Sequence, residues 1–170
     1  VAAAVLSCGS GVTIRNSLFD GSYSDGIRPD ANTVVIEDNE FRNFDDMDPY
    51  HTDPIQIYGG RNITIRRNLI TKPLKWRNES WTVKNLMEFK NAQNVLVEGN
   101  TIDDSTMLVQ HGTAHVMLRN NVMKNNNGVA IEVQGYSSIY GRGVSDVSIV
   151  NNTGVNTGPR GNFLRVNGDV

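Results

Sequence analysis

An acidic segment contains the first side chains whose types suit a chemical reaction. Residues 43–54 bring four aspartates, Tyr50 and His51 into one short stretch. A tyrosine and a histidine that are neighbours can exchange protons with a bound substrate as acid and base. The segment lies between two apolar runs, so we expect an insertion loop at residues 42–54.

The aspartates of this loop suggest a second kind of chemistry. Carboxylates at close spacing can bind Ca²⁺, an ion that takes oxygen ligands. The expected ligands are Asp48 and Asp53, joined by Glu88 from a later strand. A structural alternative stays open, in which Asp53 and its equivalent Asp25 accept hydrogen bonds from backbone N–H groups where a strand begins.

A second insertion, at residues 71–85, contains both tryptophans of the chain. Indole rings stack on sugar rings, and Lys75 and Arg77 would meet acidic groups on a polysaccharide. The alternative is that Trp76 and Trp81 pack the loop onto the body of the protein while the cations cover it. The sequence leaves these two interpretations open.

A third group of polar residues lies in short segments that alternate between apolar and polar side chains, such as Ile55-Gln56-Ile57. Alternation is the period of a strand with one buried face. If such strands stack, their polar side chains form a row that suits an extended polymer, although a solvated face explains them equally well. Lys90 and His111 lie just beyond this row. The row is predicted to contain Arg28, Gln56, Glu88, Glu132 and Arg165, with Gln110 near it.

A sequence repeat must position these groups. Its pattern is apolar, polar, apolar, two polar residues, Asn, one variable residue, apolar, with Ser17 at the Asn position of the first copy and Gly154 in the final apolar position of the last. Self-similarity at a period of about 20 to 50 residues indicates a solenoid. Each repeat also carries one alternating segment, so we expect at least two strands and two turns per rung, with successive rungs stacked in parallel. The six copies are Val12-Ile14-Ser17-Phe19, Val34-Ile36-Asn39-Phe41, Ile63-Ile65-Asn68-Ile70, Val95-Val97-Asn100-Ile102, Val116-Leu118-Asn121-Met123 and Val147-Ile149-Asn152-Gly154.

The repeated asparagine has a structural explanation. Asparagine tolerates the left-handed backbone region at a bend between strands. Its amide both donates and accepts, so stacked asparagines can bond one another and the backbone of the bend. We therefore predict a structural ladder formed by Asn39, Asn68, Asn100, Asn121 and Asn152.

Composition excludes several classes of protein. The 170 residues suit one domain, and the formal net charge of −2 comes without a polybasic run, which argues against a nucleic-acid partner. No run of about 18 apolar residues predicts a membrane span. The single cysteine excludes an internal disulfide framework and a cysteine-rich zinc site.

Rungs of this kind resemble the right-handed parallel β-helix proteins, which include pectate lyases, chondroitinase-B-like and alginate lyases, mannuronan C5-epimerases and phage tailspikes. The resemblance covers essentially the whole chain. It implies an all-β, single-stranded right-handed parallel β-helix of about six to seven rungs. The domain would span residues 1–170, with an incomplete first rung at residues 1–11. We expect a fragment or an open-ended rod whose ends are covered by flanking rungs or by another chain, because open ends expose sheet edges.

Two segments carry a closer resemblance. His51-Thr52-Asp53-Pro54-Ile55-Gln56 is similar to a His-x-Asp-Gly-Ile-Gln segment that is common in the family, with proline in place of glycine. Glu88-Phe89-Lys90, followed one rung later by Gln110-His111-Gly112, is similar to the chondroitinase-B type of lyase. In that type, Lys is the base, Arg assists as acid, and Ca²⁺ neutralises the substrate carboxylate. Gln110 stands where those lyases carry Arg, and an amide cannot supply the charged donor.

Two functions therefore compete. In one, the protein is a polysaccharide lyase or C5-epimerase that binds an acidic polysaccharide and removes the proton next to its carboxylate. The base would be Lys90 or His51, the proton donor Tyr50 or His111, and the charge stabiliser Arg28 or Ca²⁺. In the other, the rod is a structural or adhesive module. The resemblance implies a secreted or cell-surface protein. The expected substrate-binding residues are Gln56, Glu88, Gln110, Glu132, Arg165, Lys75, Trp76 and Arg77.

Overall fold

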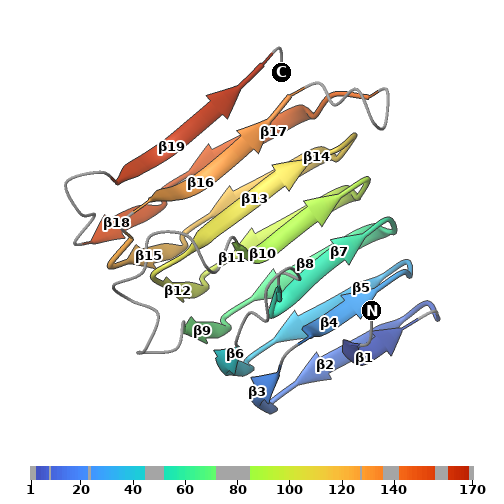
Figure 1. Cartoon of the computed structure of the whole chain (residues 1–170). Helices are drawn as coiled ribbons and strands as arrows, with labels where there is room; N and C mark the ends of the chain where they lie inside the picture. The colour runs from blue at the N-terminus through green and yellow to red at the C-terminus, as the bar shows by residue number, and fades with distance from the viewer. Residues whose placement is uncertain are drawn as a thin grey trace.

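The computed structural model describes residues 3–7, 9–22, 24–44, 52–71, 85–126, 128–135, 142–155 and 161–168. Within these ranges the regular elements are β-strands, which form three parallel sheets (Figure 1). Sheet A contains β1 (Ala3–Ser7), β4 (Asp25–Pro29), β7 (Ile55–Tyr58), β10 (Asn85–Lys90), β13 (Thr106–Gln110), β16 (Val129–Gln134) and β19 (Asn162–Asn167). Sheet B contains β2 (Val12–Arg15), β5 (Val34–Glu37), β8 (Arg61–Arg66), β11 (Gln93–Glu98), β14 (Ala114–Arg119) and β17 (Ser145–Val150). Sheet C contains β3 (Leu18–Ser22), β6 (Glu40–Phe44), β9 (Leu69–Thr71), β12 (Thr101–Asp103), β15 (Val122–Lys124) and β18 (Thr153–Val155).

The chain visits the three sheets in a fixed order, A then B then C, and each circuit adds one strand to every sheet. The expected solenoid of stacked parallel rungs is therefore confirmed. A rung has three strands, one more than the minimum of two that the repeat predicted. The reason is that the repeat spans a corner, so its first two apolar positions lie in sheet B and its last lies in sheet C. No helix long and apolar enough to cross a bilayer occurs among the described residues.

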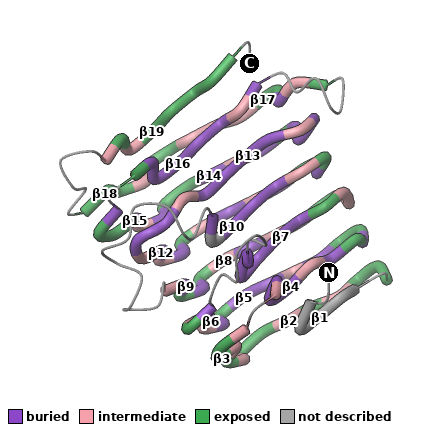
Figure 2. The backbone as a smooth tube through the Cα atoms, in the orientation of Figure 1, coloured by how far each residue is buried: buried purple, intermediate pink, exposed green. Residues whose placement is uncertain are grey.

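The strand registers stack equivalent positions of the repeat into interior columns. In sheet B, Val34 pairs with Ile63, which pairs with Val95. In sheet C, Phe19 lies opposite Phe41, with ring centroids 4.7 Å apart and nearly parallel planes. Buried residues run along the middle rungs, whereas exposed residues collect at the first and last rungs (Figure 2). The apolar positions of the repeat thus form the core, as predicted.

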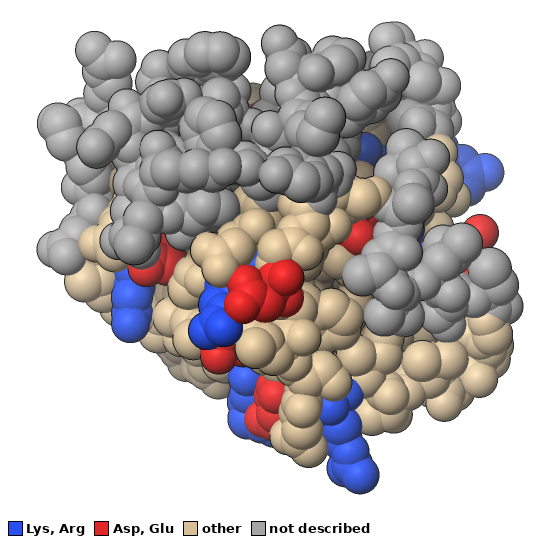
Figure 3. All heavy atoms as spheres, turned by 60° about the horizontal axis from the view of Figure 1, so that its bottom comes forward, with Lys and Arg blue, Asp and Glu red and all other residues tan. Residues whose placement is uncertain are grey.

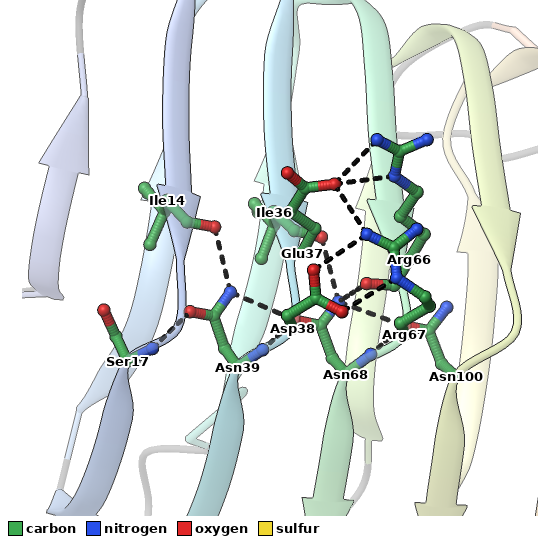
Figure 4. Close-up of polar contacts among 10 residues, drawn as sticks. All are labelled: Ile14, Ser17, Ile36, Glu37, Asp38, Asn39, Arg66, Arg67, Asn68 and Asn100. Atoms are coloured by element: carbon green, nitrogen blue, oxygen red, sulfur yellow. Dashed lines mark hydrogen bonds and ion pairs between the residues drawn. The ribbon is translucent and has the colours of Figure 1, made fainter.

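The asparagine ladder is present and continuous (Figure 4). Each ladder residue donates its backbone N–H to Oδ1 of the asparagine one rung later, beginning with Ser17 N to Asn39 Oδ1 at 3.0 Å. Each Nδ2 of Asn39, Asn68, Asn100 and Asn121 also donates to the next Oδ1, at 2.9–3.1 Å, and to a backbone carbonyl of the preceding rung. Because these four side chains are at most 3% exposed, the ladder satisfies polar groups that water does not reach.

One detail of the ladder prediction is wrong. The left-handed conformation belongs to the residue before each ladder position, for example Asp38 (φ 55°) before Asn39 and Arg67 (φ 54°) before Asn68. The ladder asparagines themselves do not have a positive φ. Asparagine is therefore required at the corner for its amide hydrogen bonds and not for its backbone freedom.

The last rung leaves interior columns exposed. Leu164 and Val166 in β19 pair with Ile131 and Val133, which are buried. They are nevertheless 44% and 53% exposed, because β19 forms the edge of sheet A. At the other edge of the same sheet, β1 pairs with β4 and places Val5 opposite Ile27.

Candidate functional site

The outward face of sheet A carries the polar row that the alternating segments predicted. Strand pairing places Gln56 opposite Glu88, and Glu132 opposite Arg165. Between Glu88 and Glu132, however, the row contains Leu108 and not a polar residue. Gln110 lies opposite Lys90, one outward position further along the strands. Leu108 faces outward in this row and is 6% exposed.

Several polar side chains of this face are buried. Glu88 is 3%, Gln56 4% and Gln110 6% exposed, so the alternative of a plain solvated face does not describe these positions. Buried polar groups need hydrogen-bond partners, and a buried carboxylate needs them most. The contacts among these residues are therefore the main structural feature of the face.

Glu88 lies at the centre of these contacts. Its Oε2 accepts a hydrogen bond from Gln56 Nε2 at 2.8 Å and pairs with Lys90 Nζ at 2.7 Å. Its Oε1 accepts one from Gln110 Nε2 at 2.6 Å. The three partners come from three successive strands, β7, β10 and β13, so one carboxylate joins three rungs. We call Gln56, Glu88, Lys90 and Gln110 the Glu88 cluster.

Two aspartates extend the cluster toward β4. Gln56 Nε2 also donates to Asp53 Oδ2 at 2.8 Å, and the backbone N–H of Asp53 donates to Asp25 Oδ1 at 3.1 Å. Asp25 thus binds a backbone N–H at the start of a strand, as the structural alternative predicted. Arg28 lies 3.7 Å from Asp25 Oδ2, and its guanidinium is 5.4 Å from the centroid of the Tyr58 ring, a cation–π arrangement.

His111 follows Gln110 at the end of β13. Burial lowers the pKa of His111 below its usual value of 6.5, and the positive charge of Lys90 lowers it further, while Glu88 acts in the opposite direction. The imidazole is therefore neutral at pH 7 and can accept a proton. Its backbone is left-handed, with φ 54°, and Gly112 follows with φ 75°.

A second glutamate repeats this arrangement two strands away. Glu132 Oε2 accepts a hydrogen bond from Arg165 at 2.6 Å. Its Oε1 accepts bonds from Asn167 at 2.8 Å and from Gln134 at 3.1 Å. Glu132 is 7% exposed, whereas the Arg165 side chain is 47% exposed. In the row, Leu108 lies between Glu132 and Glu88, and so separates Glu132 and its partners from the Glu88 cluster.

Sheet B shows a different pattern of charge. Its outward row alternates in sign, because Arg15, Glu37, Arg66, Glu98 and Arg119 pair in that order across successive strands. Arg66 bonds Glu37 at 2.7 Å, and Arg119 bonds Glu98 at 2.9 Å. Figure 3 shows basic and acidic side chains beside one another on the described part of the surface in view. The charges of these pairs cancel locally, which leaves sheet A as the better candidate for a site.

A family model described as the right handed beta helix region matches residues 2–167. The chain belongs to this family. Neither the curated proteins nor the solved structures gave a match. Membership establishes a right-handed β-helix, and it leaves the activity open because the repeat is scaffold on which different sites occur.

Several residues predicted for the β-helix site lie outside the described residues. These are Asp48, Tyr50 and His51 of the first insertion and Lys75, Trp76, Arg77 and Trp81 of the second. Their proposed roles remain predictions. Among the sequence-predicted residues that are described, Gln56, Glu88, Lys90 and Gln110 come together, and His111 follows Gln110. Asp53 joins them through Gln56, and Arg28 joins through Asp25, which binds Asp53.

The described residues of the β-helix do not fit a Ca²⁺ site at Glu88. Both of its carboxylate oxygens accept from N–H groups, and the Lys90 ammonium occupies the position a cation would take. Within the described part of the chain, no three His, Cys, Asp or Glu side chains group closely enough to hold a metal. Asp48 lies outside that part, so the Ca²⁺ prediction for the first insertion remains a prediction.

Sequence reasoning missed two contributors. Tyr58 is two residues beyond Gln56, so it faces outward opposite Lys90, and the alternation already contained that signal. Asn167 contacts Glu132 from the strand beside it. Nothing in the sequence around Asn167 predicts that contact, because it depends on how β16 and β19 align.

Proposed function

We propose that this β-helix protein binds an acidic polysaccharide at the outward face of sheet A and acts on it by β-elimination or C5-epimerisation. The observation that carries the proposal is that Lys90 and Gln110 both contact Glu88, while the charge of Lys90 acts on the imidazole of His111, the residue that follows Gln110. Both reactions remove the proton next to a carboxylate, so they need a base and a positive charge that stabilises the resulting anion.

The electrostatics favour a division of roles between the two residues. His111 has a lowered pKa and is unprotonated at neutral pH, which suits it to accept the proton. Lys90 carries its charge in an ion pair and suits the substrate carboxylate. This assignment differs from the sequence-based expectation, in which Lys90 or His51 was the base and Tyr50 or His111 the proton donor. Action on such a polymer would place the protein outside the cell or at its surface.

The proposal is tested with alginate, pectate and chondroitin. Elimination creates unsaturated sugar ends that absorb ultraviolet light, and epimerisation changes the proton NMR spectrum of the uronate residues without creating such ends. Activity on one polymer is expected, with a rate that falls as the pH drops through the pKa of His111, below 6.5. If none of the three polymers yields unsaturated ends or a changed NMR spectrum, the proposal is wrong.

A matched pair of variants isolates His111. Asparagine tolerates a left-handed backbone, so His111→Asn removes the imidazole without backbone strain. His115→Asn is the control, because His115 has φ 56° and is exposed on β14, where it pairs with Asp146. His111→Asn is expected to lose at least about 100-fold in rate, the usual contribution of a general base. His115→Asn is expected to retain the wild-type rate, and equal losses in both variants would contradict the assignment.

A non-catalytic structural or adhesive module is the second candidate, and one observation favours it. Both Glu88 oxygens are already satisfied within the protein, as expected of a network that stabilises the rod. For this candidate, binding to a polysaccharide-coated surface would persist in His111→Asn, and no polymer would be altered.

A further inference from the structure

We propose that Glu88 is a positioning residue that holds Lys90 and the two glutamine amides in place, and that it contacts neither substrate nor metal. The inference rests on the proposed function, because it assigns how that site is organised. It replaces the sequence-based expectation that Glu88 binds substrate and Ca²⁺.

Exposure separates Glu88 from the groups that can meet a ligand. The Glu88 side chain is 3% exposed, whereas those of Lys90 and Arg28 are 16% and 28% exposed. A ligand that approaches this face therefore reaches the ammonium before it reaches the carboxylate. Lys90 lies opposite Tyr58 and Gln110 at the end of β10, and its side chain is a long, flexible stem. The 2.7 Å contact with Glu88 fixes the position of its nitrogen.

The same carboxylate determines how two amides are oriented. A carboxylate only accepts hydrogen bonds, and a glutamine amide offers N–H donors on one side and a carbonyl oxygen on the other. Gln56 and Gln110 must therefore turn Nε2 toward Glu88 and their carbonyl oxygens away from it. Gln56 uses its two N–H groups on Glu88 and Asp53, so its orientation is fixed from two sides. One buried group thus organises polar side chains on three rungs.

The key variant is Glu88→Gln, which keeps the shape of the side chain but removes the charge. One of its two terminal atoms becomes an NH₂ group, which must face the donor of Gln110 or the donors of Gln56 and Lys90. The Lys90 amine loses its anionic partner, so its nitrogen is no longer held by the 2.7 Å contact and reacts more readily. The readout is the rate at which acetic anhydride acetylates Lys90, followed by mass spectrometry of the Lys90 peptide in the folded protein. We expect the rate to rise about tenfold, which corresponds to the loss of one hydrogen bond to a charged group.

Glu132→Gln is the matched control. It makes the same change in the same row of sheet A, but Glu132 contacts Arg165, Gln134 and Asn167 and not Lys90. Acetylation of Lys90 should keep its wild-type rate in this variant. If Glu88→Gln does not fold, Glu88→Asp carries the test, because its shorter side chain keeps the charge and withdraws it from Lys90; an intermediate rate is expected.

Two results would overturn the inference. One is a wild-type acetylation rate in the folded Glu88→Gln or Glu88→Asp variant, and the other is an equal rise in Glu132→Gln. The acetylation assay needs no substrate. Inactivity of the wild-type protein on all polymers would therefore refute the proposed function, while the acetylation rate of Lys90 would still test whether Glu88 holds Lys90 in place. Where the wild-type protein is active, a positioning role predicts that Glu88→Asp restores part of the turnover that Glu88→Gln loses.

Discussion

Replacement of Asn100 by alanine tests the asparagine ladder at its most buried point. Asn100 is 0% exposed, and its side chain takes part in four hydrogen bonds. Two are donated by Nδ2, to Ile65 O and to Asn121 Oδ1, both at 3.0 Å. The other two are accepted by Oδ1, from the backbone N–H and the side chain of Asn68 at 2.9 and 3.0 Å. All four are lost in Asn100→Ala.

The size of the effect follows from the groups left behind. The Asn68 N–H loses this acceptor and the Ile65 carbonyl loses this donor, both in a part of the protein that water does not reach. A stranded buried group costs about 1–3 kcal/mol, so the free energy of unfolding should fall by about 2–6 kcal/mol. Backbone strain does not contribute, because Asn100 does not have a positive φ.

Asn152→Ala is the control within the same ladder. Asn152 bonds Leu118 O and accepts from Asn121, but it lies on the last rung and is only half-buried. Water can replace its bonds, so a loss of about 1 kcal/mol is expected. Urea unfolding followed by circular dichroism measures both variants. Equal losses in the two, or a loss below about 1 kcal/mol in Asn100→Ala, would refute the argument that burial gives the ladder its strength.

Two further predictions concern other corners and the charged row. Gly60→Ala should lower the unfolding free energy by about 3 kcal/mol or more, because a Cβ at φ +83° would overlap the Ala31 carbonyl oxygen. Gly99→Ala, at φ +63° with nothing closer than 3.8 Å, should cost only about 1–2 kcal/mol in the same urea titration, and equal costs would contradict the clash. Arg66 lowers the pKa of Glu37 below 4.5, so their pair stabilises the fold at neutral pH and this contribution is lost as the pH falls through the lowered pKa. The urea midpoints of wild type and Arg66→Met should therefore differ at pH 7 and converge as the pH falls through the lowered pKa of Glu37; a pH-independent difference would refute the linkage.

The fold was predictable because the same sequence pattern recurs in six copies along the chain. The copies place their apolar residues at the same offsets, five of the six place an asparagine at the same position, and the strand pairs reproduce that alignment from Val12 to Gly154. The sequence did not predict sheets B and C as separate sheets. The corner between them takes only two residues and needs no Gly or Pro, so no turn signal marks it. The left-handed residue was misplaced for a related reason: Asp38, Arg67 and Asn120 share no residue type that would indicate it.

The candidate site was predictable only in part. Alternation identified Gln56, Glu88 and Glu132 as outward residues, and the register confirms it. It could not show that these residues are buried or that Glu88 takes three donors from three rungs. Those properties depend on side-chain geometry across strands that are about 20 to 30 residues apart in sequence, and no local pattern encodes them.

The asparagine ladder also has a consequence for how the protein can change. Neighbouring ladder residues are separated by 22, 29, 32, 21 and 31 positions, yet every step advances the coil by one rung. The extra residues of the longer steps fall between β6 and β7, between β9 and β10, and between β16 and β17. Each connection can therefore gain or lose residues without shifting the rungs on either side. Insertion and deletion at these three places would leave the scaffold in register, so new recognition segments can be exchanged there while the rod stays constant.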